Sequence, residues 1–465
     1  MFSKEDKIVL NNIFKNQGYT GSQKINGGSG VMVEIAPFKG MVYNKEKIKK
    51  LDDVMSPPYD IISEKMQNEL YEKNQYNFVK LILGKINPDD TEQNNRYTRA
   101  KKLFDEWQQH HILTPDDAPA IYPYKINYTV KKEKKQMNGF FVLLKLDPDY
   151  KTVKAHEKTL AKPKADRLNL MRACYANLEP IQLMYMDEHD SIRKTMDAAV
   201  DTPLTAVRGY DGFTHQLWRL NNQDVVSTIV QDLQKKILFI ADGHHRYQTS
   251  INYAQEKREQ TGNNDPHAPY NYIMVVLCNM FDPGLSILPT HRFIKMPNVN
   301  MNDFSKKLEK YFSVEKRPLN GSQRNAEKIG KTIMADIETT TDHKFALYTQ
   351  DAYYILTLKD THIMDSLAAD HSKTWRTLDV SILHKLILEE FLGITEKNLE
   401  DHVKYTRVDA EAIQLVNNGT YDFSFLINAT KIDQLKAIAD ANEVMPQKST
   451  YFLPKMLSGL VMYKM

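Results

Sequence analysis

The chain has 465 residues, of which 42% are hydrophobic and 26% are charged, an ordinary globular composition that excludes a largely disordered protein. A formal net charge of +3 is too small to indicate a protein that follows nucleic-acid phosphates. Two cysteines, Cys174 and Cys278, supply no disulfide framework, and no apolar run approaches the length of a membrane span. We expect a cytoplasmic protein of two or three domains.

The first 31 residues differ from the rest of the chain. Residues 18–30, GYTGSQKINGGSG, are rich in Gly and Ser, which is typical of a linker. We expect residues 1–31 to form a flexible N-terminal extension, and we predict no function for them.

A rigid loop is predicted at SPPYD (56–60). Two successive prolines keep the backbone extended and exclude a helix there. Ser63 can then cap a helix that begins in the following residues. The loop would hold Tyr59 and Asp60 in a fixed place, where they could contact a substrate. A purely structural turn explains the pattern equally well.

Residues 94–111 carry apolar side chains at helical spacing. Two strand-like segments follow, YPYKINYTV (122–130) and NGFFVLLKL (138–146). The basic run KKEKK between them is predicted to be the solvated tip of a hairpin.

A second group of charged residues follows the hairpin. His156-Glu157 is not a zinc-protease motif, because HExxH would require a His where the chain has Leu160. Glu157 could act as a general base, with His156 orienting it or binding substrate. Lys164 and Arg167 lie near the start of a predicted helix, where basic side chains suit phosphate oxygens. An exposed charged loop would show the same pattern.

The most informative segment is ILFIADGHHRYQTSINYA (237–254). Four apolar residues predict a buried strand, Asp242-Gly243 a tight turn, and HHR the start of a helix that runs to about Gln260. The first N–H groups of a helix favour anions, and Arg246 beside them could hold a phosphate with two parallel hydrogen bonds. Gly243 allows a sharp turn or a close approach of a ligand. In the alternative interpretation, Asp242 only caps a helix.

Two later segments also carry groups suited to phosphate. LPTHRF (288–293) places His291 and Arg292 at the end of a strand, where they could neutralise a phosphate or a carboxylate. The tail MPQKSTYFLPK (445–455) carries two hydroxyls and two ammonium groups but lacks the spacing of a P-loop. These four residues are Lys448, Ser449, Thr450 and Lys455.

Strands and helices alternate irregularly and no internal repeat is visible, which predicts an α+β class with mixed sheets. We expect a catalytic or nucleotide-binding region over residues 32–298. A smaller C-terminal α+β domain would follow over residues 299–465.

The strand–DGHHR–helix segment resembles the signature turn of the ParB-like superfamily. Within that superfamily it is most similar to the free-serine kinases, which also carry an upstream His-Glu pair such as His156-Glu157. Over most of its length the chain is identified as a member of the DUF 1015 family. Five segments carry that resemblance: SPPYDII (56–62), HEKTLAKPKADRLNL (156–170), FIADGHHRY (239–247), LPTHRF (288–293) and MPQKSTYFLPK (445–455).

The kinase resemblance implies transfer of a phosphoryl group from ATP or ADP to a small hydroxyl metabolite, with free L-serine as the first candidate. Glu157 would be the general base, and Asp242 would hold Mg²⁺. His245, Arg246 and the N–H groups after Gly243 would hold the transferred phosphoryl group. The remaining nucleotide contacts would be Gly243, His244, Tyr247, Lys164, Arg167, His291 and Arg292, and the substrate contacts would be His156, Tyr59 and Asp60.

Two other functions fit the same residues. One is a non-catalytic, nucleotide-binding regulatory module of the ParB-like type. The absence of a convincing helix-turn-helix and the balanced charge disfavour direct binding of nucleic acid. The other is a metal-dependent hydrolase that uses Asp242, His244, His245 and His156. The side chains of adjacent histidines diverge, which disfavours this function. No membrane partner is expected, and the sequence does not predict an oligomeric state.

Overall fold

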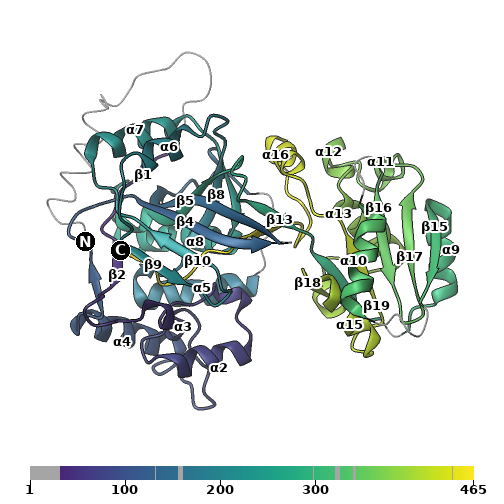
Figure 1. Ribbon diagram of the computed structural model, residues 1–465, viewed down its shortest axis with the longest axis horizontal. Helices are drawn as coiled ribbons and strands as arrows, with labels where there is room; N and C mark the ends of the chain where they lie inside the picture. Colours follow the sequence, from purple (N-terminus) through teal and green to yellow (C-terminus); the bar gives the residue numbers. More distant parts are fainter. Residues whose placement is uncertain are drawn as a thin grey trace. The chain divides into compact units, whose positions relative to one another are not determined.

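The computed structural model describes residues 32–130, 132–155, 161–296, 298–319, 325–338, 342–441 and 443–465. These residues form two compact units (Figure 1). The first unit contains the described residues up to 285 together with residues 454–465, and the second contains residues 286–453. From the sequence, we expected the boundary between the two domains to lie between residues 298 and 299. We did not expect the C-terminal segment to return to the first unit.

The first unit is built on a nine-stranded mixed sheet. Two neighbouring pairs, β6 with β11 and β8 with β12, are parallel, and the other pairs are antiparallel. In order across the sheet the strands are β6 (Val153–Lys154), β11 (Leu238–Asp242), β8 (Ile181–Tyr185), β12 (Tyr272–Asn279), β5 (Glu133–Lys145), β4 (Tyr122–Val130), β10 (Thr214–Leu217) and β9 (Thr205–Arg208), with β1 (Ile35–Ala36) paired to β5. The predicted hairpin is therefore β4–β5.

Burial of apolar residues explains how the central strand β12 and the helix α7 are placed in this unit. Every residue of β12 is buried, as expected for an apolar strand covered on both faces. Helix α7 (Gln223–Gln234) buries Val226, Ile229, Val230 and Leu233, which lie on one helical face. Helix α6 (Ser191–Asp197) packs on α7, and Figure 1 shows the two helices together at one edge of the unit.

The helices next to the candidate site form a second group. Helix α5 (Ala161–Cys174) packs on α4 (Arg96–Gln109) and on α8 (His244–Thr261). Helices α2 (Glu64–Lys73) and α3 (Val79–Ile82) precede α4. The expected cap is confirmed, because the Ser63 hydroxyl accepts a hydrogen bond from the Met66 N–H at the start of α2.

The predicted strand, turn and helix around DGHHR are confirmed. Strand β11 ends at Asp242, Gly243 forms the turn, and α8 begins at His244. The helix ends at Thr261, one residue beyond the expected end, where Gly262 adopts a left-handed conformation.

The last residues of the chain return to the first unit. Strand β21 (Tyr463–Lys464) pairs with β7 (Ala176–Asn177), and β2 (Met41–Tyr43) pairs with β3 (Leu113–Pro115). Residues 454–465 also lie next to the candidate site, because Lys455 contacts Asp242 and Ser458 contacts Glu179.

The second unit contains a six-stranded antiparallel sheet. Its strands, in order, are β15 (Phe312–Pro318), β17 (Ala352–Leu358), β16 (Lys344–Tyr348), β19 (Phe423–Ile427), β14 (His291–Ile294) and β18 (Val403–Thr406). Helices α10 (Ala326–Ile337) and α15 (Asp409–Asn417) pack on each other and on this sheet. Strands β13 (Ser286–Leu288) and β20 (Tyr451–Leu453) pair where the chain enters and leaves the unit. The other helices are α9 (Met301–Tyr311), α11 (Ile363–Leu367), α12 (Lys373–Arg376), α13 (Asp379–Ile382), a π-helical segment (Leu383–Phe391), α14 (Leu399–His402) and α16 (Ile432–Asp440).

The predicted class, α+β with a mixed sheet, is confirmed: both units combine helices with a sheet, and the sheet of the first unit is mixed. Among the residues that the structure describes, no helix combines the length and the apolar character needed to cross a membrane.

Candidate functional site

The start of helix α8 is the centre of the candidate site. Gly243 precedes the helix with φ +94° and ψ 27°, a left-handed conformation that favours glycine. Because glycine has no side chain, it cannot cap the first N–H groups of α8. The start of an 18-residue helix that lacks this cap has the dipole and the N–H geometry that favour an anion.

A substitution at Gly243 tests this geometry. A Cβ on Gly243 would lie 3.0 Å from Arg246 Nε, in addition to the strain of the positive φ. We expect Gly243→Ala to lower the free energy of unfolding by about 1–2 kcal/mol, measured by urea denaturation, and to displace Arg246.

Gly262→Ala is a matched control at the other end of α8. Gly262 also has a positive φ, +63°, but no neighbouring atom lies within 4 Å of its added Cβ. Gly262→Ala should lower the free energy of unfolding through the strain of the positive φ, and it should leave anion binding unchanged. Equal effects of the two substitutions on anion binding would contradict the role of Gly243.

Asp242 joins two cations at the end of β11. One carboxylate oxygen lies 2.9 Å from Arg246 Nη2, and the other lies 2.8 Å from Lys455 Nζ. Arg246 also donates to the backbone carbonyl of Pro180. Burial alone would lower the pKa of Arg246, but Asp242 and Glu179 outweigh it, so the pKa is raised and the guanidinium stays charged.

Glu179 is a second, fully buried carboxylate beside the arginines. Arg167 Nη1 donates to its Oε2 at 3.1 Å, and the Tyr59 N–H and the Ser458 hydroxyl donate to its Oε1 at 3.0 and 3.1 Å. Burial raises the pKa of Glu179, against the lowering effect of Arg246 and Arg167. The guanidinium of Arg167 also stacks 3.8 Å from the centre of the Tyr59 ring. The SPPYD loop is thus fixed to the site through Tyr59.

Asp166 extends the network from Arg167 to helix α4. Its Oδ2 accepts from Arg167 Nε at 2.8 Å, and its Oδ1 accepts from the Tyr97 hydroxyl at 2.7 Å and from Arg96. Burial alone would raise the pKa of Asp166, but Arg167, the Tyr97 hydroxyl and Arg96 together hold it below its usual range.

The lowered pKa of Asp166 predicts a pH dependence. The ionised carboxylate stabilises the folded chain at pH values above its unfolded pKa of about 3.9, and this contribution is lost as the pH falls through the lower folded pKa. We expect Asp166→Asn to be less stable than the wild type at pH 7 and to approach it below about pH 4. Urea unfolding from pH 7 to pH 3 measures the difference, and a gap that is constant over this range would contradict the prediction.

The other predicted residues of the first unit have different surroundings. His244 is buried, His245 is half-buried and Asp60 is exposed. The Lys164 carbonyl accepts from the Thr249 hydroxyl of α8 at 3.4 Å. Tyr247 is buried in the core, where its hydroxyl accepts from the Asp147 N–H at 3.0 Å. His156 and Glu157 lie outside the described residues.

His291 and Arg292 belong to the second unit, and both are buried there. His291 Nε2 lies 2.9 Å from Asp409 Oδ1. Arg292 donates to the carbonyls of Thr290 and Lys448 and lies 5.6 Å from the centre of the Tyr405 ring. These contacts position both side chains within their own unit, and their predicted role in holding phosphate stays a prediction.

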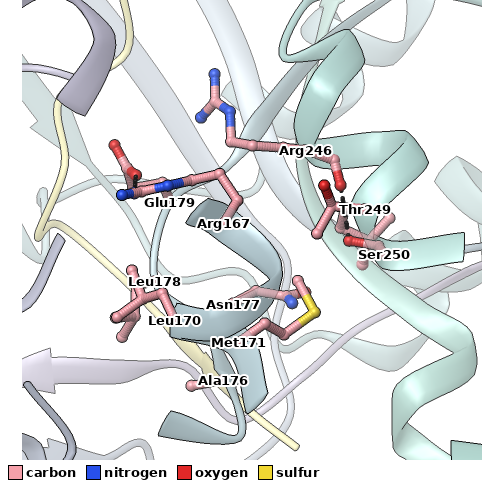
Figure 2. A pocket seen from close by; sticks show the side chains of 11 residues that line it. Arg167, Leu170, Met171, Ala176, Asn177, Leu178, Glu179, Arg246, Thr249 and Ser250 are labelled. Carbon is pink, nitrogen blue, oxygen red and sulfur yellow. Dashed lines mark hydrogen bonds and ion pairs between the residues drawn. The ribbon is translucent and has the colours of Figure 1, made fainter. Parts of the chain in front are cut away.

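A small cavity lies beside Arg167, Glu179 and Arg246 (Figure 2). Figure 2 shows Arg167 and Glu179 pointing toward one another, with Arg246 extending from α8, which also supplies Thr249 and Ser250. The volume is about 40 Å³, which suits a water molecule and is far below the range of ligand pockets. The cavity by itself therefore cannot hold a nucleotide.

Asp242 does not form a metal site with its described neighbours. Within the described ranges, no group of three or more His, Cys, Asp or Glu side chains could hold a metal ion. The two oxygens of Asp242 face Arg246 and Lys455, and two cations repel a third. The described residues do not fit bound Mg²⁺, and Mg²⁺ at Asp242 stays a prediction.

Sequence reasoning missed Glu179 and the pairing of Lys455 with Asp242. A weak signal for Glu179 was present, because it directly precedes Pro180 and the apolar strand β8. Lys455 was noted only as one of four polar residues in the tail, since its partner lies 213 positions away.

Comparison with known proteins identifies the family. The sequence matches the family described as "Protein of unknown function (DUF1015)" over residues 35–381, which is most of the chain. The chain belongs to the DUF1015 family. No curated protein matches this DUF1015 chain.

Solved structures give distant likenesses of this DUF1015 protein. A conserved hypothetical protein from Pyrococcus furiosus is 14% identical, with a TM-score of 0.32, 67% of this chain covered and 90% of that chain. A free serine kinase in complex with AMP is 13% identical, with a TM-score of 0.33 and coverage of 67% and 87%. SbnI with a C-terminal truncation, from Staphylococcus aureus, is 11% identical, with a TM-score of 0.31 and coverage of 69% and 86%. At these TM-scores the likenesses carry no argument about function.

Proposed function

We propose that the protein is a phosphotransferase that moves a phosphoryl group from ATP or ADP to a small hydroxyl metabolite, with free L-serine as the first candidate. The supporting observation is that Arg246 and Lys455 both form ion pairs with the carboxylate of Asp242, which lies beside the start of α8. A phosphate there would meet two cations and the positive end of a helix dipole.

The ion pairs favour binding because they order the cations in advance. Arg246 and Lys455 are held by separate oxygens of Asp242, so neither side chain has to lose much rotamer freedom when an anion arrives. An anion would share these cations with Asp242, and the small cavity would have to widen to admit it.

The reaction follows from these roles. The oxygen of the substrate hydroxyl attacks the terminal phosphorus, and the bond from phosphorus to the bridging oxygen of the nucleotide breaks. Glu157 takes the proton of the hydroxyl, and the nucleotide leaves with the bridging oxygen and its electron pair. Arg246 and His245 stabilise the charge on the transferred group, while Tyr59 and Asp60 contact the acceptor. We assign no step to Mg²⁺.

The test is incubation of the purified chain with ATP or ADP and a pool of small hydroxyl metabolites, followed by mass detection of phosphorylated products. We expect phosphoserine or a related phosphate ester. If the protein binds nucleotide and forms no product, it is a non-catalytic nucleotide-binding module.

A further inference from the structure

A second, larger cavity is lined by Arg96, which belongs to the ion-pair network through Asp166. Its volume is about 430 Å³, within the range of ordinary ligand pockets of about 300–1,000 Å³. It is bordered by the start of α2, by the residues after α3 and by Arg96 at the start of α4. We propose that this cavity binds the adenosine end of the nucleotide, an inference that rests on the proposed function.

The position of the cavity connects it to the phosphate-binding groups. Arg96 lines the cavity and forms an ion pair with Asp166, whose other oxygen binds Arg167. Ile62, another lining residue, is two positions beyond Asp60 in the loop that Glu179 holds through Tyr59. A nucleotide with its base in the cavity would therefore pass Arg96 on the way to Arg167 and Arg246.

The lining suits a flat, largely apolar group with a polar edge. Ile62, Leu83 and Ile86 supply apolar surface, and Ile86 is 71% exposed although it is a large hydrophobic residue. A base that covered Ile86 would remove this surface from water.

Two side-chain amides supply the polar contacts. Gln67 and Asn68 lie next to one another on α2 and line the cavity. Gln67 donates through Nε2 to the Leu83 carbonyl at 2.7 Å, which fixes the amide orientation. Its oxygen can then accept from an exocyclic amino group such as that of adenine.

The positive charge near the cavity suits the sugar–phosphate part of the ligand. Lys85 lines the cavity, and its ammonium group lies 4.9 Å from the centre of the Tyr71 ring. Lys85 and Arg96 supply two cations against Glu64, which also lines the cavity. A ligand that is apolar at one end and anionic at the other matches this distribution.

The test compares ADP with pyrophosphate as probes for the full-length chain in calorimetric titrations. Pyrophosphate has the phosphates of ADP without adenosine. We expect Ile86→Glu to weaken ADP binding by about tenfold or more, through loss of apolar contact with the base, and to leave pyrophosphate binding unchanged. Asn68→Ala should weaken ADP binding severalfold in the same selective way. Both positions are exposed, so neither substitution should prevent folding.

Ile237→Glu is the matched control. Ile237 is an exposed isoleucine of the same unit, 41% accessible, and it precedes β11 at the end opposite Asp242. The same substitution there should change neither affinity.

The outcomes separate this inference from the proposed function. If the wild type binds neither ADP nor pyrophosphate, the proposed function fails and the inference fails with it. If the wild type binds both but Ile86→Glu changes neither, only the assignment of the cavity is overturned. An equal loss of ADP and pyrophosphate in Ile86→Glu overturns it as well, because the effect would then not concern adenosine.

Discussion

Replacing Arg246 with alanine is expected to abolish measurable binding of nucleotide phosphates and to lower the free energy of unfolding by about 2–3 kcal/mol. The loss of stability follows because the guanidinium, on a side chain that is only 11% exposed, pairs with Asp242 and lies near Glu179. Without the guanidinium, Asp242 and Glu179 each lose a nearby cation. Lys455 remains beside Asp242, and Arg167 remains beside Glu179. Urea unfolding measures the stability, and calorimetric titration with pyrophosphate measures the binding.

Two variants separate lost binding from lost folding. Arg246→Lys keeps the charge but not the planar fork, so it should restore part of the stability and little of the affinity. Arg258→Ala makes the same truncation in the last turn of α8, where Arg258 donates to Asn271 at 2.6 Å. It should lower stability and leave pyrophosphate binding unchanged. If Arg246→Ala folds and binds pyrophosphate like the wild type, its role in phosphate binding is refuted.

The local part of the site could be predicted because its signals are local. A run of apolar residues, Asp242-Gly243 and a helical pattern occupy one continuous segment, and the strand, the turn and the helix all formed there. The same holds for Ser63, whose capping role depends on residues three positions away. Short-range patterns therefore predicted these elements and placed the ends of α8 and the start of α2 to within one residue.

The partners of these residues could not be predicted, because strand pairing brings them together from distant positions. Glu179 directly precedes Pro180 and β8, and it reaches the site because β8 pairs with β11. Lys455 reaches Asp242 because the chain returns to the first unit after residue 453. Periodicity cannot reveal such a return, since β7 and β21 are short and far apart in the sequence.

Arg167 shows how the residue type alone leaves a role undecided. Its place near a helix start with other basic residues suggested a phosphate contact. In the structure it bridges Asp166 and Glu179 and stacks on Tyr59. These contacts also suit a residue that holds the SPPYD loop and the buried carboxylates in place.

A substitution at Glu157 tests the chemical step itself. Glu157→Gln keeps the size of the side chain and its capacity for hydrogen bonds but removes its capacity to accept a proton. We expect turnover to fall by about 10²–10⁴-fold while nucleotide affinity stays nearly unchanged, because general-base catalysis acts in the transition state. Single-turnover measurements with detection of the phosphorylated product, combined with calorimetric titration of ADP, give the two quantities.

Glu179→Gln is the matched comparison, because it makes the same isosteric change at a carboxylate that holds arginines. Its charge pairs with Arg167 and lies near Arg246, so its loss should weaken nucleotide binding and lower turnover through that weaker binding. Turnover at saturating nucleotide should then be largely preserved in Glu179→Gln and lost in Glu157→Gln. If Glu157→Gln retains wild-type turnover, Glu157 is not the base. If the two substitutions give equal, small effects on both quantities, the site does not perform phosphoryl transfer, and nucleotide binding without chemistry becomes the better account of the geometry at the start of α8.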